Sequence, residues 1–476
     1  MKLHKTIKWR GVVLHKRLAV FLVGAMVACA VCAKPPTKVQ FWFDTEDYTY
    51  DPSNDAIRDL ANLLTEEGVK GHFNIVGYLA KFIQEKRRFD VIDALKPHLV
   101  GSQTMYHSYH PNVVEMTDLA DYDAAYRLAA VQESESAGML KAVFGRDTLA
   151  FAVQPGPGSS YVALDVYADQ GIPIFGDMGA LRQPDRGLLW YQNMLQVPYN
   201  GGALESFLPG KFEKFDLEKT LDRCAKQEYA VFSMHPHTMV RVRHWDIDNF
   251  KCGNNVEFGK WNPPELRSKA DYDITLKRLR DFVRRLKADP RFVFSDTDEI
   301  MAQLKPRVPI TAADVPAIRR SLLASFGPVS SPASWSVADC FQAVLRLLRG
   351  EKEYRPGHVY GFLSRPEGVK TPVKVKAADL RAAAARIAFR RHLPAAYDVG
   401  GVTLGPADLL FAALEVLETG ADEVTVTPRD QLGDIAKCLP SLATFTHRGR
   451  WIYWPQFKDE YLSDRLRLQY WTLRYE

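Results

Sequence analysis

The sequence is poor in cysteine, which excludes two common uses of that residue. Only six of the 476 residues are cysteine. The four beyond residue 33 are Cys224, Cys252, Cys340 and Cys438. Their spacing is too wide for a Cys-x-x-Cys metal motif, and separate buried or partly buried thiols are the favoured interpretation over a disulfide framework.

The main part of the chain also lacks an excess of charge of either sign. The formal net charge is +5, but residues 1–33 hold six of the 62 lysines and arginines and no acid. The rest of the chain therefore carries 56 basic against 57 acidic residues. A nearly neutral chain gives no electrostatic basis for nucleic-acid binding, so we expect no nucleic-acid partner.

Long apolar runs are absent after residue 33, and the one that precedes it has the pattern of an export signal. Leu18–Ala33 is apolar, follows a basic start and ends in small residues before Lys34-Pro35-Pro36. This order predicts a signal peptide over residues 1–33. We expect an exported protein that is periplasmic, attached to the cell surface or secreted. An N-terminal membrane anchor is the alternative, because the run is close to the lower length limit for a span.

Short apolar runs alternate with helical stretches from Lys38 to about Leu304. The apolar runs are Val39–Phe43, His72–Val76, Leu99–Ser102, Leu149–Val153, Pro173–Phe175, Leu195–Val197, Ala230–Ser233 and Phe292–Phe294. The main helical stretches are Asp55–Glu67, Asp118–Phe144, Leu217–Lys226 and Asp271–Lys287. Such alternation predicts an α/β fold with a parallel sheet. We expect an irregular (β/α) barrel of seven or eight strands over residues 34–305.

A change of composition near Lys305–Pro309 predicts a boundary, followed by a mainly helical C-terminal domain over residues 310–476. Ala338–Leu348 matches Ala407–Leu417 at an offset of 69 residues, which suggests two related helical units. The tail is rich in aromatic residues, for which packing against the first domain is the favoured role over stacking on sugars.

Chemically useful side chains follow several of the predicted strands. Asp44, Glu46 and Asp47 end the first strand, and His235 ends a later one. Barrels of this kind place their active sites at the carboxyl ends of the strands. Asp44 and Glu46 share one face of an extended chain, and a turn could add Asp47. One carboxylate is expected to bind a metal and another to act as general base.

Histidines supply the other expected ligands and a proton donor. His107 and His110 are three residues apart, so that on a helical turn both can bind one metal. His235 is the candidate proton donor, with His237 and His244 as nearby alternatives. Asp177 and Trp190 are candidates to orient catalytic groups or substrate. Carboxylates with imidazoles favour a divalent metal, and zinc is the expected ion.

Together these residues resemble the polysaccharide deacetylase family, also called the NodB-homology domain or carbohydrate esterase family 4, over roughly Lys38–Leu304. The family's first motif is Thr-Phe-Asp-Asp, and Phe43-Asp44-Thr45-Glu46-Asp47 resembles its longer Asp-x-Glu-Asp variant. The resemblance implies that Asp44 is the base and that Glu46 or Asp47 is a metal ligand. The fifth motif, an apolar residue and then His, resembles Met234-His235, which implies that His235 protonates the leaving amine.

The other motifs depart from the family pattern. The second motif is His-Ser/Thr-x-x-His, and Gln103-Thr104-Met105-Tyr106-His107 has its spacing with glutamine in place of the first histidine. His110 is the candidate metal ligand that compensates for the missing histidine. If the motif is placed instead on His107–Pro111, both histidines are present but the spacing is one residue short. The third motif is Arg-x-x-Pro, where this chain has Gln154 near the Arg position. The Asp of the fourth motif resembles Asp177.

The C-terminal region resembles pseudomurein-binding-like repeats, helical modules associated with cell envelopes. The likeness is carried by Leu393–Val402 followed by Ala407–Leu410. It implies an envelope-binding role for that region, and a plain helical appendage is the alternative.

The leading hypothesis is an exported, metal-dependent hydrolase that removes N-acyl (acetyl) groups from an amino-sugar polysaccharide or cell-wall glycan. Its first alternative is a catalytically inactive glycan- or cell-envelope-binding protein, which Gln103 and Gln154 favour. Glutamine is a weak metal ligand compared with imidazole, and it cannot supply the charge of a guanidinium group. The second alternative is a metal-dependent amidase that acts on a small substrate.

Overall fold

The computed structural model describes residues 34–156, 158–182, 187–388, 391–448 and 452–476. The predicted signal peptide, residues 1–33, lies outside the described residues. No helix within the described ranges is long and apolar enough to cross a bilayer.

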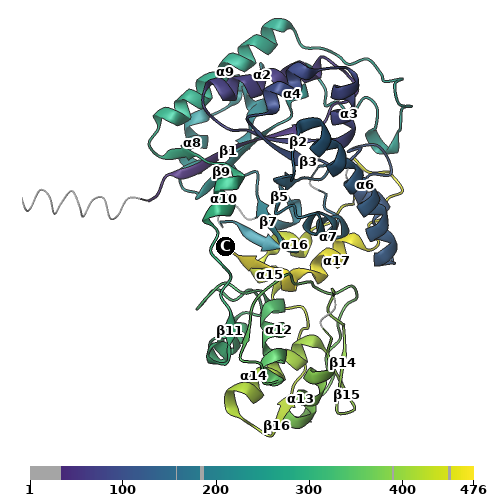
Figure 1. Cartoon of the computed structure of the whole chain (residues 1–476), viewed down its shortest axis with the longest axis vertical. Coiled ribbons are helices and arrows are strands. Elements are labelled where there is room, and N and C mark those ends of the chain that lie inside the picture. Colours follow the sequence, from purple (N-terminus) through teal and green to yellow (C-terminus); the bar gives the residue numbers. More distant parts are fainter. Residues whose placement is uncertain (1–33, 157, 183–186, 389–390, 449–451) are drawn as a thin grey trace, which may run out of the picture.

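One curled sheet forms the core of the first unit (Figure 1). Its strands run in the order β17-β6-β7-β5-β4-β3-β2-β1-β9-β8, and β10 pairs with β1 beside this path. The strands are β1 (Thr37–Thr45), β2 (His72–Ile75), β3 (Leu99–Ser102), β4 (Phe151–Ala152), β5 (Ile174–Gly176), β6 (Leu189–Tyr191), β7 (Met194–Val197), β8 (Gly202–Ala203), β9 (Tyr229–Met234), β10 (Phe292–Phe294) and β17 (Arg474–Tyr475).

The central strands of this sheet are parallel and the barrel is incomplete. From β7 through β5, β4, β3, β2 and β1 to β9, every neighbouring pair is parallel. The two ends of the path, β8 and β17, do not pair with each other among the described residues. The predicted irregular (β/α) barrel is therefore confirmed.

Helices cover the outer face of the sheet, which explains why its central strands are apolar on both faces. The larger ones are α2 (Ser53–Glu66), α3 (Gly77–Glu85), α4 (Phe89–Leu95), α6 (Tyr122–Phe144), α7 (Tyr161–Asp169), α8 (Leu217–Cys224), α9 (Lys269–Ala288) and α10 (Thr297–Gln303). The α6 helix starts where the Asp121 side chain accepts hydrogen bonds from the backbone N–H groups of Asp123 and Ala124. It ends at Gly145, whose left-handed backbone suits glycine.

The second unit is smaller and mainly helical. Its helices are α11 (Val315–Ala324), α12 (Val337–Leu348), α13 (Ala377–Arg386) and α14 (Pro406–Thr419). The short helices α15 (Ile435–Cys438) and α16 (Pro440–Thr444) follow, and Ser441 of α16 donates a hydrogen bond to the carbonyl oxygen of Ala180 in the first unit. Two short antiparallel sheets accompany them: β13 (Val373–Lys376) pairs with the distant β16 (Glu423–Val426), and β14 (Tyr397–Val399) forms a hairpin with β15 (Val402–Leu404). In the repeated segments, Asp339 and Asp408 each accept a hydrogen bond from the backbone N–H three residues earlier.

The last part of the chain returns to the barrel (Figure 1). There β17 pairs antiparallel with β6, and α17 (Leu462–Leu468) lies near α7. The backbone N–H of Gln192 donates to Thr472 Oγ1 across 2.9 Å. Tyr470 and Trp471 are fully buried. Trp471 packs against Phe341 and Phe362 of the second unit, so the residues beyond about 440 contribute to both units. The predicted boundary near residues 305–310 and the envelope-binding role stay predictions.

The cysteines form no disulfide among the described residues. Cys224 and Cys340 are buried, Cys438 is half-buried and Cys252 is exposed, and all four are free thiols.

Candidate functional site

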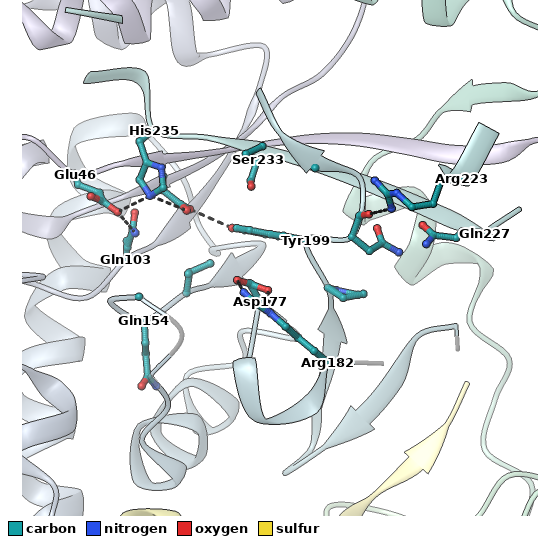
Figure 2. A pocket seen from close by; sticks show the side chains of 17 residues that line it. Glu46, Gln103, Gln154, Asp177, Arg182, Tyr199, Arg223, Gln227, Ser233 and His235 are labelled. Atoms are coloured by element: carbon teal, nitrogen blue, oxygen red, sulfur yellow. Dashed lines mark hydrogen bonds and ion pairs between the residues drawn. The ribbon is translucent and has the colours of Figure 1, made fainter. Parts of the chain in front are cut away.

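A cavity of about 630 Å³ opens at the carboxyl ends of several parallel strands (Figure 2). Asp44 and Glu46 come from the end of β1, Gln103 follows β3, and His235 follows β9. Tyr199, after β7, reaches across the cavity toward the end of β1. The parallel sheet therefore brings together residues that lie up to 191 positions apart in the sequence, as expected of a barrel active site.

Neutral donors hold Asp44 in place. Its Oδ1 accepts hydrogen bonds from Asn74 Nδ2 at 2.8 Å and from Tyr199 Oη at 3.1 Å. Its Oδ2 lies 3.7 Å from His235 Nε2. Burial raises the pKa of the Asp44 carboxyl group to about 6, although the positive charge of His235 opposes this.

Glu46 is the centre of the site. Its Oε1 accepts a hydrogen bond from Gln103 Nε2 at 2.8 Å and lies 3.1 Å from His107 Nε2 and 3.6 Å from His235 Nε2. Burial alone would raise the pKa of Glu46, but the positive charges of His107 and His235 outweigh it and lower that pKa well below its ordinary value. A single carboxylate oxygen thus faces two imidazole nitrogens.

Each histidine around Glu46 is oriented through its other ring nitrogen. His235 Nδ1 lies 2.8 Å from Glu205 Oε1, and His244 Nδ1 lies 2.9 Å from Asp246 Oδ1. His107 Nδ1 lies 2.7 Å from the hydroxyl of Ser108, which itself donates to Asp246 Oδ2. Carboxylates that hold one imidazole nitrogen leave the other for a ligand, an arrangement typical of metal sites.

The surroundings of His235 favour positive charge. Burial alone would lower the pKa of this imidazole, but the carboxylates of Glu46, Glu205 and Asp44 outweigh burial and raise it to about 10. The pKa of His237 changes in the opposite direction, because burial and the neighbouring His244 lower it well below its ordinary value.

Three side chains could hold a metal ion. Ligand atoms of Glu46, His235 and His244 all lie within 4.8 Å of one another. In addition, the buried Oε1 of Gln103 has no hydrogen-bond partner among the described residues. One carboxylate and two imidazoles fit a divalent ion such as zinc. The sequence analysis gave His244 only as an alternative proton donor, yet its position nine residues after His235 brings it close to both Glu46 and His235.

Two of the predicted metal ligands have other partners. Asp47 Oδ2 forms a buried ion pair with Arg241 at 2.8 Å and accepts a hydrogen bond from Ser53. His110 Nδ1 lies 2.8 Å from Glu115, and its Nε2 lies 2.8 Å from the carbonyl oxygen of Phe250. The structure therefore brings His107 to Glu46 but brings neither His110 nor Asp47 there.

The two glutamines at the divergent motif positions differ in their contacts. Gln103 reaches Glu46, as described above. Gln154 lines the cavity but turns away from Asp44, because its Oε1 accepts the backbone N–H of Ser160 at 2.7 Å. Asn74 and Tyr199 hold Asp44 in this chain, and sequence reasoning missed both. The signal for Asn74 was a polar residue inside the apolar run His72–Val76.

The remaining predicted site residues lie at the edge of the cavity or outside it. Asp177 lines the cavity and is paired with Arg182, whose Nε donates to its Oδ1 at 3.0 Å. Burial raises the pKa of Asp177, and Arg182 opposes that rise. Trp190 on β6 packs under Arg474 of β17 and donates its indole N–H to Glu476. It does not line the cavity.

Comparisons with known proteins give similar structures only. No family model and no curated protein matches the sequence. A pseudoenzyme of carbohydrate esterase family 4 from Bacillus anthracis is 14% identical and has a TM-score of 0.32, over 56% of this chain and 66% of its own. The match thus spans slightly less than two thirds of that protein's length.

Two further solved structures are similar to this chain. A putative polysaccharide deacetylase from Mycobacterium smegmatis is 15% identical, with a TM-score of 0.37, over 58% of this chain and 94% of its own. A family 4 carbohydrate esterase from Streptomyces lividans, solved in complex with acetate, is 15% identical and has a TM-score of 0.27, over 43% of this chain and 81% of its own.

Proposed function

We propose that the chain is an exported, metal-dependent hydrolase that removes N-acyl groups from an amino-sugar polymer. One observation carries the proposal: ligand atoms of Glu46, His235 and His244 converge within 4.8 Å at a cavity that also contains the carboxylate of Asp44. Export is part of the proposal and rests on the pattern of residues 1–33.

The metal would be held by Glu46, His235 and His244. His107 and Gln103, which contact the same oxygen of Glu46, orient that carboxylate. When bound, a zinc-type ion would polarise the acyl carbonyl group and lower the pKa of a bound water. The three ligands are one carboxylate and two imidazoles, a donor set common to catalytic zinc sites.

Asp44 is the proposed proton acceptor. Asn74 and Tyr199 occupy its Oδ1, which leaves Oδ2 to face the cavity. From there Oδ2 can take a proton from the attacking water and return it to the departing amine. Tyr199 positions Asp44 and forms part of the wall against which the substrate lies.

The volume of the cavity suits a sugar rather than a large apolar ligand. About 630 Å³ is within the range of small-molecule sites. Its walls combine the carboxylates of Asp44 and Asp177 with the amides of Gln103, Gln154 and Asn200. Such donors and acceptors match the hydroxyl and amide groups of an N-acylated sugar.

Acetate release from N-acetylated chitooligosaccharides tests the proposal. The protein supplied with zinc should release acetate, and a chelator should abolish the release. Asp44→Asn should lower turnover by about 10²–10⁴-fold, whereas Asp273→Asn, an exposed carboxylate on α9, should not change it.

The rival function is glycan binding without catalysis, and one observation favours it. Gln154 supplies no charge to Asp44, and the side chains that donate hydrogen bonds to Asp44, those of Asn74 and Tyr199, are neutral. Oligosaccharide binding by the zinc-supplied protein with no acetate release would overturn the hydrolase proposal in favour of this rival. Hydrolysis of small N-acyl amides alone would instead indicate an amidase.

A further inference from the structure

The cavity continues past Tyr199 into a second one. The second cavity has a volume of about 440 Å³, and Pro198, Asn200, Arg223 and Gln227 line both. Figure 2 shows Arg223 and Gln227 at the end opposite Glu46 and His235, with Tyr199 between the two groups. A polymer that enters the first cavity can therefore extend into the second.

Arg223 is held at this junction without being neutralised. Its Nη1 donates to the carbonyl oxygen of Asn200 at 2.5 Å, and its Nη2 donates to that of Gly201 at 2.6 Å. Carbonyl groups fix the guanidinium plane but carry no net charge, and other N–H donors remain.

The peptide that holds Arg223 is itself anchored to the sheet. Asn200 Nδ2 donates to the carbonyl oxygen of Tyr229, and its Oδ1 accepts the backbone N–H of Val231. The backbone N–H of Gly201 also donates to β9, at Val231. The position of the guanidinium group is thus set by a strand, as a preorganised binding site requires.

The second cavity carries an excess of positive charge. Lys34, Arg223 and Lys226 line it, against the single carboxylate of Glu228. Within the described ranges none of these three cations forms an ion pair, whereas Arg278 and Arg285 of the neighbouring α9 pair with Glu213 and Glu218.

We propose that this end of the cavity binds an anionic group, a carboxylate or a phosphate, carried by the glycan substrate. The proposal rests on the proposed function in that the glycan occupies the first cavity. Arginine binds both kinds of anion with two parallel hydrogen bonds. This charge also sets the direction of the chain, because Arg223 attracts the anion at the end of the cavity opposite Glu46 and His235.

Ligand-observed saturation-transfer NMR on the full chain tests this proposal without any need for turnover. The probes are N-acetylglucosamine, N-acetylmuramic acid and N-acetylglucosamine 6-phosphate, which share the acetamido sugar and differ in the anion. At least one anionic probe should bind about tenfold more tightly than the neutral sugar at low salt, since hydrogen bonds to charged groups are the stronger ones. Which of the two binds more tightly identifies the anion.

The variants compare Arg223 with Lys219, another cation on α8. Arg223→Gln should abolish the preference for the anion, so that the anionic probes bind no more tightly than N-acetylglucosamine. Lys226→Gln should reduce the preference, and it covers the case in which Arg223→Gln fails to fold. Lys219→Gln is the matched control, because Lys219 is an exposed cation one turn earlier on α8 that lines neither cavity.

The outcomes separate this inference from the proposed function. Equal binding of all three probes, or a preference that survives in both Arg223→Gln and Lys226→Gln, would overturn the anion site even if acetate is released. A preference that depends on Arg223, without acetate release, would keep the anion site and overturn the hydrolase.

Discussion

The indole N–H of Trp245 donates a hydrogen bond to Oε2 of Glu46 across 2.6 Å. Trp245 is fully buried and packs edge-on against Tyr48 and Phe250. Because its ring cannot move freely, the bond fixes one oxygen of Glu46 and turns the other toward His107 and His235. Trp245 is thus a positioning residue for the proposed metal site.

Replacing Trp245 by phenylalanine should therefore weaken metal binding while the fold is kept. Loss of such an outer partner costs about 10–100-fold in metal affinity. Competition with a chromophoric chelator measures the zinc affinity of Trp245→Phe. Trp261→Phe is the control, since Trp261 belongs to the same aromatic cluster but has no bond to Glu46. Equal zinc affinity in both variants would contradict the positioning role.

Asp47 is expected to matter for stability and not for metal binding. Its partner Arg241 is fully buried, and breaking a buried ion pair from one side leaves an uncompensated charge. Asp47→Asn should lower the free energy of unfolding by about 3 kcal/mol, since Asp248 still pairs with Arg241. Denaturant unfolding and zinc titration of the same variant provide the test. Loss of zinc binding with unchanged stability would restore Asp47 as a ligand.

The sequence predicted the barrel well because its signals are local. The apolar runs at Leu99–Ser102 and Phe292–Phe294 coincide with β3 and β10, and those at Val39–Phe43 and Ala230–Ser233 lie within β1 and β9. Parallel strands buried on both faces must be continuously apolar, so their positions are visible without tertiary information. Strand β17 was not visible, because it is only two residues long and pairs with β6, which lies far away in the chain.

The site could be predicted only in part. Glu46 and His107 meet, as the motif spacing suggested, but His110 three residues later binds Glu115 instead. Whether an imidazole faces Glu46 depends on the backbone conformation of the loop that carries it, and the spacing of the histidines in the sequence does not determine that conformation. His107 itself has a positive φ of 52°, which turns its side chain out of any helical register with His110. Contacts of His244, Trp245 and Tyr199 depend on how distant strands assemble.

A chain that stops at residue 305 is not expected to fold stably, although it contains every predicted strand of the barrel. It would lose β17, which pairs with β6, and α17, whose Leu466 carbonyl oxygen accepts a hydrogen bond from the buried hydroxyl of Tyr191. A buried polar group left without its partner costs about 1–3 kcal/mol. Circular dichroism and limited proteolysis of residues 34–305 would measure this. A cooperative unfolding transition of that fragment would show instead that the first unit is independent.

Glu133 should make the protein less stable as the pH rises. This carboxyl group of α6 is fully buried, and its only charged or hydroxyl partner among the described residues is Tyr167, which donates to Oε2 at 2.8 Å. Burial raises its pKa from 4.5 to about 8, while the hydrogen bonds from Tyr167 and the backbone of Met105 oppose the rise. Between these two values the folded protein keeps a proton that the unfolded chain has lost. The stability that Glu133 contributes is therefore complete below about pH 4.5 and is lost progressively up to about pH 8, by about 5 kcal/mol at most.

Glu133→Gln removes this titration and keeps the shape of the side chain. The variant should be more stable than the natural chain at pH 8, and the difference should vanish toward pH 4.5. Denaturant unfolding at a series of pH values gives both curves. Glu135→Gln is the matched control, because Glu135 is exposed on the same helix. If Glu133→Gln and Glu135→Gln changed the pH dependence equally, the slope would reflect overall charge, and the buried carboxyl group would not be its cause.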